Sequence, residues 1–186
     1  GNYNRIMLSP VLSGDKTIDD IMLHPHAWYS DKNIRFIAGD AAVKIDRPRK
    51  QVHTEKGEIV DYDRLILATG SKPFVPPILG SDLKGVISFR DIYDVNTMLD
   101  YCKSKQNAVV IGGGLLGLEA AYGLKQRGMN VTVLHLMDRI MERQLDSRAS
   151  SLLRQSIEAK GINIITQANT EQLLGEDGHV THIKLK

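Results

Sequence analysis

The sequence predicts an α/β protein whose second half is built on a parallel sheet, and three observations carry this prediction. After residue 91, apolar strand-like runs alternate with amphipathic helical patterns through short connections, which is the order of a parallel sheet with right-handed crossovers. Residues 71–85 hold three of the six prolines, so an irregular connector precedes this regular part. A glycine-rich turn at residues 112–117 lies between an apolar run and a helical pattern.

The change of pattern places a domain boundary near residue 90, which gives predicted domains over residues 1–90 and 91–186. Ile6, Met7 and Leu8 form an apolar run that is expected to be buried. In the first domain, periodicity predicts a helix over 26–30, strands over 34–39, 41–46, 51–60 and 62–70, and a turn over 47–50. In the second domain it predicts helices over 92–104, 115–128 and 147–161, strands over 107–112, 130–136 and 162–166, and a hairpin over 171–186 that turns at 176–178.

Composition excludes several classes of protein. The 186 residues are 42% hydrophobic and 25% charged, which is ordinary for a globular domain that buries a core. A formal net charge of +2 gives no global attraction to nucleic acid or to a membrane, and no apolar run approaches the ~18 residues that span a bilayer. The single cysteine, Cys102, allows no internal disulfide, dithiol redox pair or four-cysteine cluster. We therefore expect a cytoplasmic protein with no nucleic-acid or membrane partner.

The segment VVIGGGLLGLEAAYGL, residues 109–124, contains a phosphate-binding pattern. Gly112, Gly114 and Gly117 fit G-x-G-x-x-G, and the pattern is informative because it follows a predicted strand and opens a predicted helix. The first glycine permits a tight turn, the second lets the backbone approach a pyrophosphate, and the third lets the helix pack on the strand. We therefore predict a Rossmann-like NAD(P)-binding domain. The cofactor-binding residues expected in this turn are Gly112, Gly113, Gly114, Leu115 and Gly117.

Nucleotide choice depends on the end of the second strand, where an acidic side chain holds the adenosine ribose in NAD-binding units. In this sequence the position holds His135, and Asp138 and Arg139 follow shortly after it. A histidine cannot replace a carboxylate as a permanent acceptor, whereas an arginine can meet a 2′-phosphate. We therefore expect His135 and Arg139 to contact the nucleotide and both NADH and NADPH to be used, with Asp138 as the alternative ribose ligand.

Several motifs together resemble a known family. These are ATGSKPFVPP (68–77) before the connector, VVIGGGLLGLEAA (109–121) and VTVLHLMDRIMERQLD (131–146). They resemble the two-dinucleotide-domain flavoprotein reductases. Within that group, YNRIMLSPVLSGDKTIDDIML (3–23) and MERQLD (141–146) are most similar to the flavoprotein module of the NAD(P)H-dependent assimilatory nitrite reductase large subunits.

The resemblance implies that the first domain is a partial, discontinuous FAD-binding domain. In the family, the NAD domain is inserted into the FAD domain, which carries its own glycine fingerprint and a later Gly-Asp. Neither is found here, so we expect the sequence to be an excerpt from a longer enzyme with an incomplete flavin site.

Five further residues are implied by the resemblance as cofactor contacts. Arg5 and Leu8 match a stretch beside the flavin, and Thr69 and Gly70 match a segment that passes the FAD phosphate and ribityl chain. Glu119 matches an acidic residue that contacts the nicotinamide carboxamide. The alternative interpretation of Glu119 is a surface glutamate with no ligand, stabilised near the positive end of a helix dipole. We assign no catalytic or metal-binding residue.

The resemblance implies an electron-transfer enzyme, in which NAD(P)H reduces FAD and electrons pass to a metal centre. In the resembled enzymes that centre is a sirohaem and iron–sulfur unit elsewhere in the polypeptide, and it reduces nitrite. A rubredoxin- or ferredoxin-type reductase and a non-catalytic dinucleotide-binding fragment stay open as alternatives. The expected partners are a redox acceptor domain or protein and, as a candidate, a second copy of the chain.

Overall fold

A computed structural model describes residues 2–186, and the chain divides into two compact units. The larger unit comprises residues 4–21 and 72–186, and the smaller comprises residues 2–3 and 22–71. The compact units therefore do not follow chain order. The expected domains, a partial FAD-binding domain over residues 1–90 and an NAD(P)-binding domain over 91–186, were defined by the cofactor that each would bind. This division stays a prediction.

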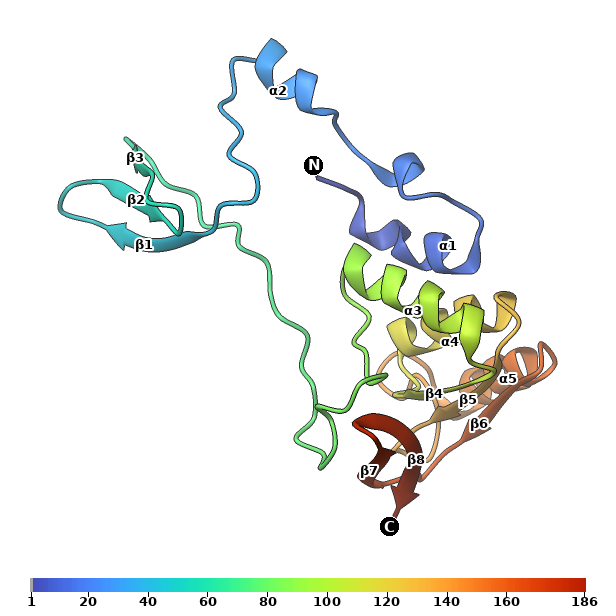
Figure 1. Cartoon of the computed structure of the whole chain (residues 1–186). Coiled ribbons are helices and arrows are strands. Elements are labelled where there is room, and N and C mark those ends of the chain that lie inside the picture. Colours follow the sequence, from blue (N-terminus) through green and yellow to red (C-terminus); the bar gives the residue numbers. More distant parts are fainter. Residues whose placement is uncertain (1) are drawn as a thin grey trace. The chain divides into compact units, whose positions relative to one another are not determined.

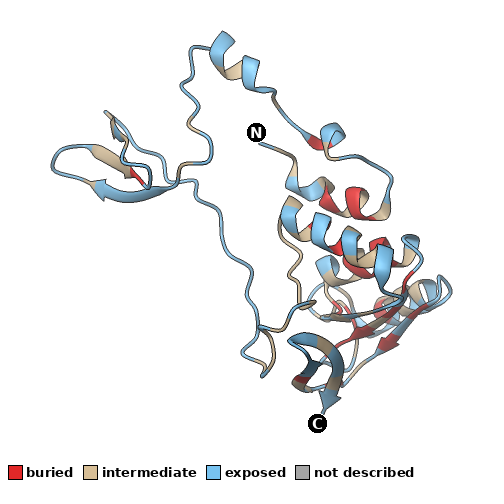
Figure 2. Ribbon diagram, viewed as in Figure 1, coloured by how far each residue is buried: buried red, intermediate tan, exposed pale blue. Residues whose placement is uncertain are grey.

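A three-stranded parallel sheet with the strand order β4-β5-β6 lies at the centre of the larger unit (Figure 1). Helix α4 (Leu115–Gln126) joins β4 to β5, and helix α5 (Ser147–Glu158) joins β5 to β6. Buried side chains of β5 and β6 contribute to the core (Figure 2). The predicted α/β fold with a parallel sheet is confirmed. The three strands are β4 (Asn107–Ile111), β5 (Asn130–Leu134) and β6 (Ile162–Ile165).

The remaining regular elements of the second half also match their predicted positions. Helix α3 (Ile92–Ser104) begins with a capping box between Asp91 and Asp94, which satisfies two otherwise unpaired backbone donors. The strands β7 (Thr170–Glu176) and β8 (His179–Leu185) pair as an antiparallel hairpin. Asp177 and Gly178 form its turn, with φ values of 50° and 75°, as a two-residue Asp-Gly turn requires.

Helix α1 (Leu8–Ser13) lies on α4, although the two are far apart in the sequence. They approach closely because Gly123 has no side chain: a Cβ there would lie 2.7 Å from Leu12 Cγ. Arg127, just after α4, donates to the carbonyls of Leu12 at 2.7 Å and Val11 at 3.0 Å. These bonds satisfy carbonyls that the end of a helix leaves unpaired.

A 3₁₀ turn, η1 (Arg5–Met7), precedes α1, and a second, η2 (Asp19–Ile21), follows it. Within the run Ile6-Met7-Leu8, only Leu8 is buried, and Ile6 is 83% exposed. The expectation that the whole run is buried is therefore wrong. The helical turns at this point direct successive side chains to different faces.

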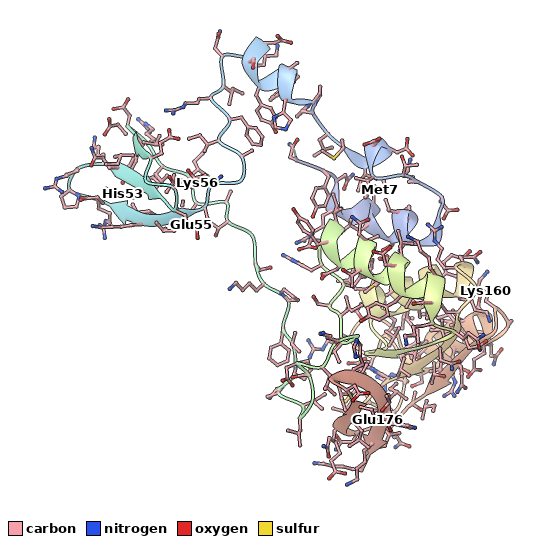
Figure 3. All side chains as sticks on the ribbon, viewed as in Figure 1. Met7, His53, Glu55, Lys56, Lys160 and Glu176 are labelled. Atoms are coloured by element: carbon pink, nitrogen blue, oxygen red, sulfur yellow. The ribbon has the colours of Figure 1, made fainter. Side chains whose placement is uncertain are left out.

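The smaller unit contains an antiparallel sheet in the order β1-β2-β3 and a short helix, α2 (His26–Asp31). The predicted strands over 41–46 and 51–60 and the turn over 47–50 are confirmed, with the second run divided by a turn into β2 and β3. The middle strand carries His53 (Figure 3). The bounds are β1 (Ala42–Asp46), β2 (Gln51–Thr54) and β3 (Ile59–Asp61).

Two expected strands, over 34–39 and 62–70, are wrong. Neither segment pairs with another strand among residues 2–186, and both have irregular backbone. The apolar run in the second segment is open to solvent, with Ile66 87% and Leu67 67% exposed. An apolar run becomes a strand only when a neighbouring strand takes its backbone hydrogen bonds.

Candidate functional site

The turn between β4 and α4 is built on two glycines that the backbone itself requires. Gly112 has a φ of 122°, in the region that favours glycine, and its N–H donates to Leu134 O at 2.8 Å. A Cβ on Gly117 would lie 2.0 Å from Gly112 O, so the first turn of α4 packs directly on the end of β4. These two glycines are explained by the fold alone.

Gly114 is different, because nothing in the protein requires a glycine there. Its φ of −86° and ψ of −178° suit any residue, and a Cβ would meet no atom of residues 2–186 within 4 Å. Gly114 is also the N-cap of α4, and no side chain caps this helix end. The open space therefore faces unpaired backbone N–H groups and the positive end of the helix dipole. A pyrophosphate fits this site, because it needs both features.

Leu115 follows Gly114 at the first position of α4, and its side chain is exposed. Its backbone N–H belongs to the helical turn that has no intrahelical acceptor. The sequence-based expectation that Leu115 contributes to cofactor binding stays a prediction, and the position of its backbone supports it.

Gly113 has a role that the sequence pattern did not show. A Cβ there would lie 2.8 Å from Ile140 Cγ2 and 3.0 Å from His135 Cγ, so this glycine lets the segment after β5 pack against the turn. Its N–H donates to His135 Nδ1 at 3.0 Å. The N–H of the peptide before Gly113 is thus held by the protein.

The His135 ring lies inside the protein, with both nitrogens in hydrogen bonds. The residue is 8% exposed, and Nε2 lies 3.0 Å from Glu142 Oε2. A hydrogen bond from its own backbone N–H lowers the pKa of Glu142, and the contact with His135 lowers it further. The expected contact between His135 and the ribose stays a prediction, but the ring already has two protein partners.

Arg139 and Asp138 lie beyond the end of β5 and are both accessible. Arg139 Nη1 lies 3.3 Å and 3.4 Å from the two carboxylate oxygens of Asp138. The Nε atom of Arg139 is buried and has no hydrogen-bond partner among residues 2–186. The rest of the guanidinium is partly exposed, so its outer nitrogens can donate to an anion.

Glu119, in the second turn of α4, is fixed by a residue from the other end of the chain. Ser9 Oγ on α1 donates to Glu119 Oε2 at 2.5 Å. One carboxylate oxygen is thereby occupied, and the carboxylate is held in a defined position. Sequence reasoning missed Ser9, because the partners are separated by 110 positions and a serine carries no motif of its own.

The four residues that the resemblance assigns to the flavin fall in different units. Arg5 and Leu8 belong to the larger unit, where Arg5 is exposed and Leu8 is buried in the core. Thr69 and Gly70 belong to the smaller unit and are exposed. Gly70 has a φ of 72°, and a Cβ there would meet no atom within 4 Å, so the backbone leaves room for a group to approach. Contact of all four residues with FAD stays a prediction.

The described part of the chain holds neither a metal-binding cluster nor a membrane-spanning helix. Among residues 2–186, no three His, Cys, Asp or Glu side chains are grouped so that they could hold a metal ion. In the same part of the chain, no helix combines the length and hydrophobicity needed to cross a bilayer.

The β4–turn–α4–β5 arrangement, with its open glycine and uncapped helix, defines a Rossmann-type dinucleotide-binding unit. Residues 2–186 match the family model described as pyridine nucleotide-disulphide oxidoreductase. The chain belongs to this family. Membership supports FAD and NAD(P)H as its cofactors.

Individual relatives refine this assignment. The chain is 50% identical to the NAD(P)H nitrite reductase of Bacillus subtilis over 176 residues, covering 95% of this chain and 22% of that protein. It is 44% identical to the assimilatory nitrate reductase electron transfer subunit of the same organism, covering 94% of this chain and 23% of that protein. The chain thus spans less than a quarter of the length of these two relatives.

Solved structures share the fold. A ferredoxin reductase from Rhodopseudomonas palustris superimposes with a TM-score of 0.90 at 27% identity, covering 98% of this chain and 45% of that one. A putidaredoxin reductase in complex with putidaredoxin gives the same TM-score and identity over 99% of this chain and 46% of that one. The predicted resemblance to two-dinucleotide-domain flavoprotein reductases is confirmed.

Gly117 is required by the packing of the fold, whereas Gly114 leaves space for a ligand, so substitutions at the two positions should have different effects. Gly114→Val fills the open space, so we expect the dissociation constant for NADH to rise by at least about tenfold, or ~1.4 kcal/mol. We expect unfolding free energy to fall by only about 1 kcal/mol or less, the cost of a poorer N-cap. Fluorescence titration with NADH and urea unfolding measure the two quantities.

Gly117→Ala is the matched comparison. Its Cβ would collide with Gly112 O, so we expect it to destabilise the fold by more than about 2 kcal/mol. Unchanged NADH affinity in Gly114→Val would show that the space over Gly114 does not hold the nucleotide.

Proposed function

We propose that the chain is the NAD(P)H-oxidising flavoprotein part of an electron-transfer oxidoreductase, most similar to that of nitrite reductase. The observation that carries this proposal is the open space over Gly114 at the uncapped N-terminus of α4. Half of the aligned residues are identical to those of a protein named NAD(P)H nitrite reductase, which supports nitrite as the final electron acceptor of the whole protein.

The residues of the turn bind and orient the nucleotide in this proposal. Backbone N–H groups at Gly114 and Leu115 donate to the pyrophosphate, and the positive end of the α4 dipole strengthens these bonds. Glu119, held by Ser9 at 2.5 Å, accepts a hydrogen bond from the nicotinamide carboxamide through its second oxygen. Bound FAD supplies the acceptance of a hydride and the release of single electrons.

A rubredoxin- or ferredoxin-type reductase is the second candidate. The chain is 33% identical to the NADH-rubredoxin oxidoreductase of Clostridium acetobutylicum over 174 residues, and its fold matches that of a ferredoxin reductase. Both candidates use the same nucleotide site, so the acceptor distinguishes them. Whether the chain works as a homodimer stays a prediction.

The proposal is tested on the whole protein under anaerobic conditions. We expect NADH or NADPH to bleach the visible absorbance of the oxidised flavin, and nitrite to restore it with production of ammonia. Restoration by rubredoxin or ferredoxin, with no response to nitrite, would favour the second candidate. If neither NADH nor NADPH reduced the flavin, both candidate functions would be contradicted. The remaining alternative would be a non-catalytic dinucleotide-binding fragment.

The preference between NADH and NADPH depends on the side chains beyond β5 that are accessible to the nucleotide. Because the His135 ring already bonds Gly113 and Glu142, the accessible candidates for the ribose end are Arg139 and Asp138. The arginine attracts a 2′-phosphate, and the aspartate accepts from ribose hydroxyls. Such a pair accommodates both nucleotides, which supports the use of both NADH and NADPH.

Arg139→Ala removes one half of this pair. We expect affinity for NADPH to fall by about tenfold, the loss of one charge-assisted contact, while affinity for NADH changes by less than about threefold. Parallel fluorescence titrations measure the ratio, with Arg148→Ala, an exposed arginine on α5, as the matched control. An equal loss for both nucleotides would show that Arg139 does not meet the 2′-phosphate.

A further inference from the structure

The segment that follows β5 holds the backbone of Gly113 at both its N–H and its carbonyl. Its N–H donates to His135 Nδ1 at 3.0 Å, and its carbonyl accepts from the backbone N–H of Met141 at 3.0 Å. Ile140, which is 1% exposed, packs where a Cβ of residue 113 would be. We call His135, Ile140, Met141 and Glu142 the Gly113 clamp.

The hydrogen bonds of the clamp determine the tautomer of His135. Nδ1 accepts from the Gly113 N–H, so it carries no proton, and the ring proton lies on Nε2. Nε2–H then donates to Glu142 Oε2, 3.0 Å away. The glutamate thus orients the ring, and the ring orients the turn, as a carboxylate does when it fixes a ligand histidine from behind.

The backbone at Met141 shows that this arrangement is maintained against a cost, and a hydrogen bond from α5 stabilises it. Met141 has a φ of 53°, which is uncommon for a residue with a side chain, and its N–H is the one that bonds Gly113 O. Such conformations persist only where the surroundings impose them. Ser150, 2% exposed, donates to Ile140 O at 2.8 Å and fixes the clamp to α5.

We propose that His135 and Glu142 are positioning residues for the dinucleotide. His135, with Glu142 behind it, holds the N–H of the Gly112–Gly113 peptide, and Met141 in the same clamp holds the carbonyl of the next peptide. The N–H of that second peptide is the one of Gly114, which meets the pyrophosphate, so the two bonds together set its direction. The inference rests on the proposed nucleotide site and adds the residues that hold it in its binding geometry. It also separates two roles for His135: a positioning residue acts through the turn on NADH and NADPH alike, whereas a ribose ligand discriminates between them.

Two matched variants test whether the Nδ1 acceptor of His135 is the part of the ring that matters for binding. His135→Asn places an amide oxygen near the position of Nδ1 and keeps an acceptor for the Gly113 N–H. His135→Gln reaches toward Glu142 and supplies no acceptor at that position. We expect affinity for both nucleotides to fall by about tenfold in His135→Gln, the effect of one unsatisfied buried donor. We expect a smaller fall, of about threefold, in His135→Asn, which keeps that acceptor but loses the contact with Glu142.

A second measurement needs no nucleotide. In the free chain, we expect ¹⁵N shifts of the His135 ring to show a proton on Nε2 and none on Nδ1. We expect the Gly113 amide to exchange with solvent more slowly than the Gly114 amide, and His135→Asn to preserve this difference while His135→Gln abolishes it.

The outcomes are distinct. A changed NADH-to-NADPH ratio in either variant, parent-like affinity in His135→Gln, a proton on Nδ1, or equal exchange of the two amides would overturn the proposal. If the parent chain bound neither nucleotide, the proposed function would fail, while ring tautomer and amide exchange would still decide whether the clamp exists.

Discussion

The close approach of Gly117 to the carbonyl of Gly112 is the contact on which the rest of the site depends. A Cβ at residue 117 would lie 2.0 Å from that oxygen, so α4 can begin where it does only because no side chain is present. This start points the free N–H groups of the helix into the open space over Gly114. In the proposed site, anion binding therefore rests on backbone geometry and needs no charged side chain.

The same helix links the nucleotide site to the N-terminal segment of the chain. Leu12 packs into the space left by Gly123, Arg127 caps α1, and Ser9 donates to Glu119. The α1 segment carries residues that the resemblance places beside the flavin, and α4 carries the proposed nicotinamide contact. One helix–helix contact within a single compact unit therefore connects residues proposed for the two cofactors.

The sequence predicted the features that depend on local pattern. The alternation after residue 91 identified every helix and strand of the parallel sheet, and the glycine spacing identified the turn. It failed where structure depends on distant partners: residues 34–39 and 62–70 are apolar enough for strands but have none to pair with among residues 2–186. The inward direction of the His135 ring could not be predicted either. A histidine at a strand end can bind a nucleotide or accept a hydrogen bond inside the protein, and the sequence does not distinguish these roles.

In the proposed site, the pyrophosphate of NAD(P)H binds the backbone at Gly114 and the first turn of α4. The most direct measurement is a titration of the ¹⁵N-labelled chain with NADH, followed through the amide resonances. We expect the largest shifts at the Gly114, Leu115 and Leu116 amides, and we expect them to saturate together with the fluorescence of bound NADH. Saturable binding that leaves these three amides unshifted would contradict it.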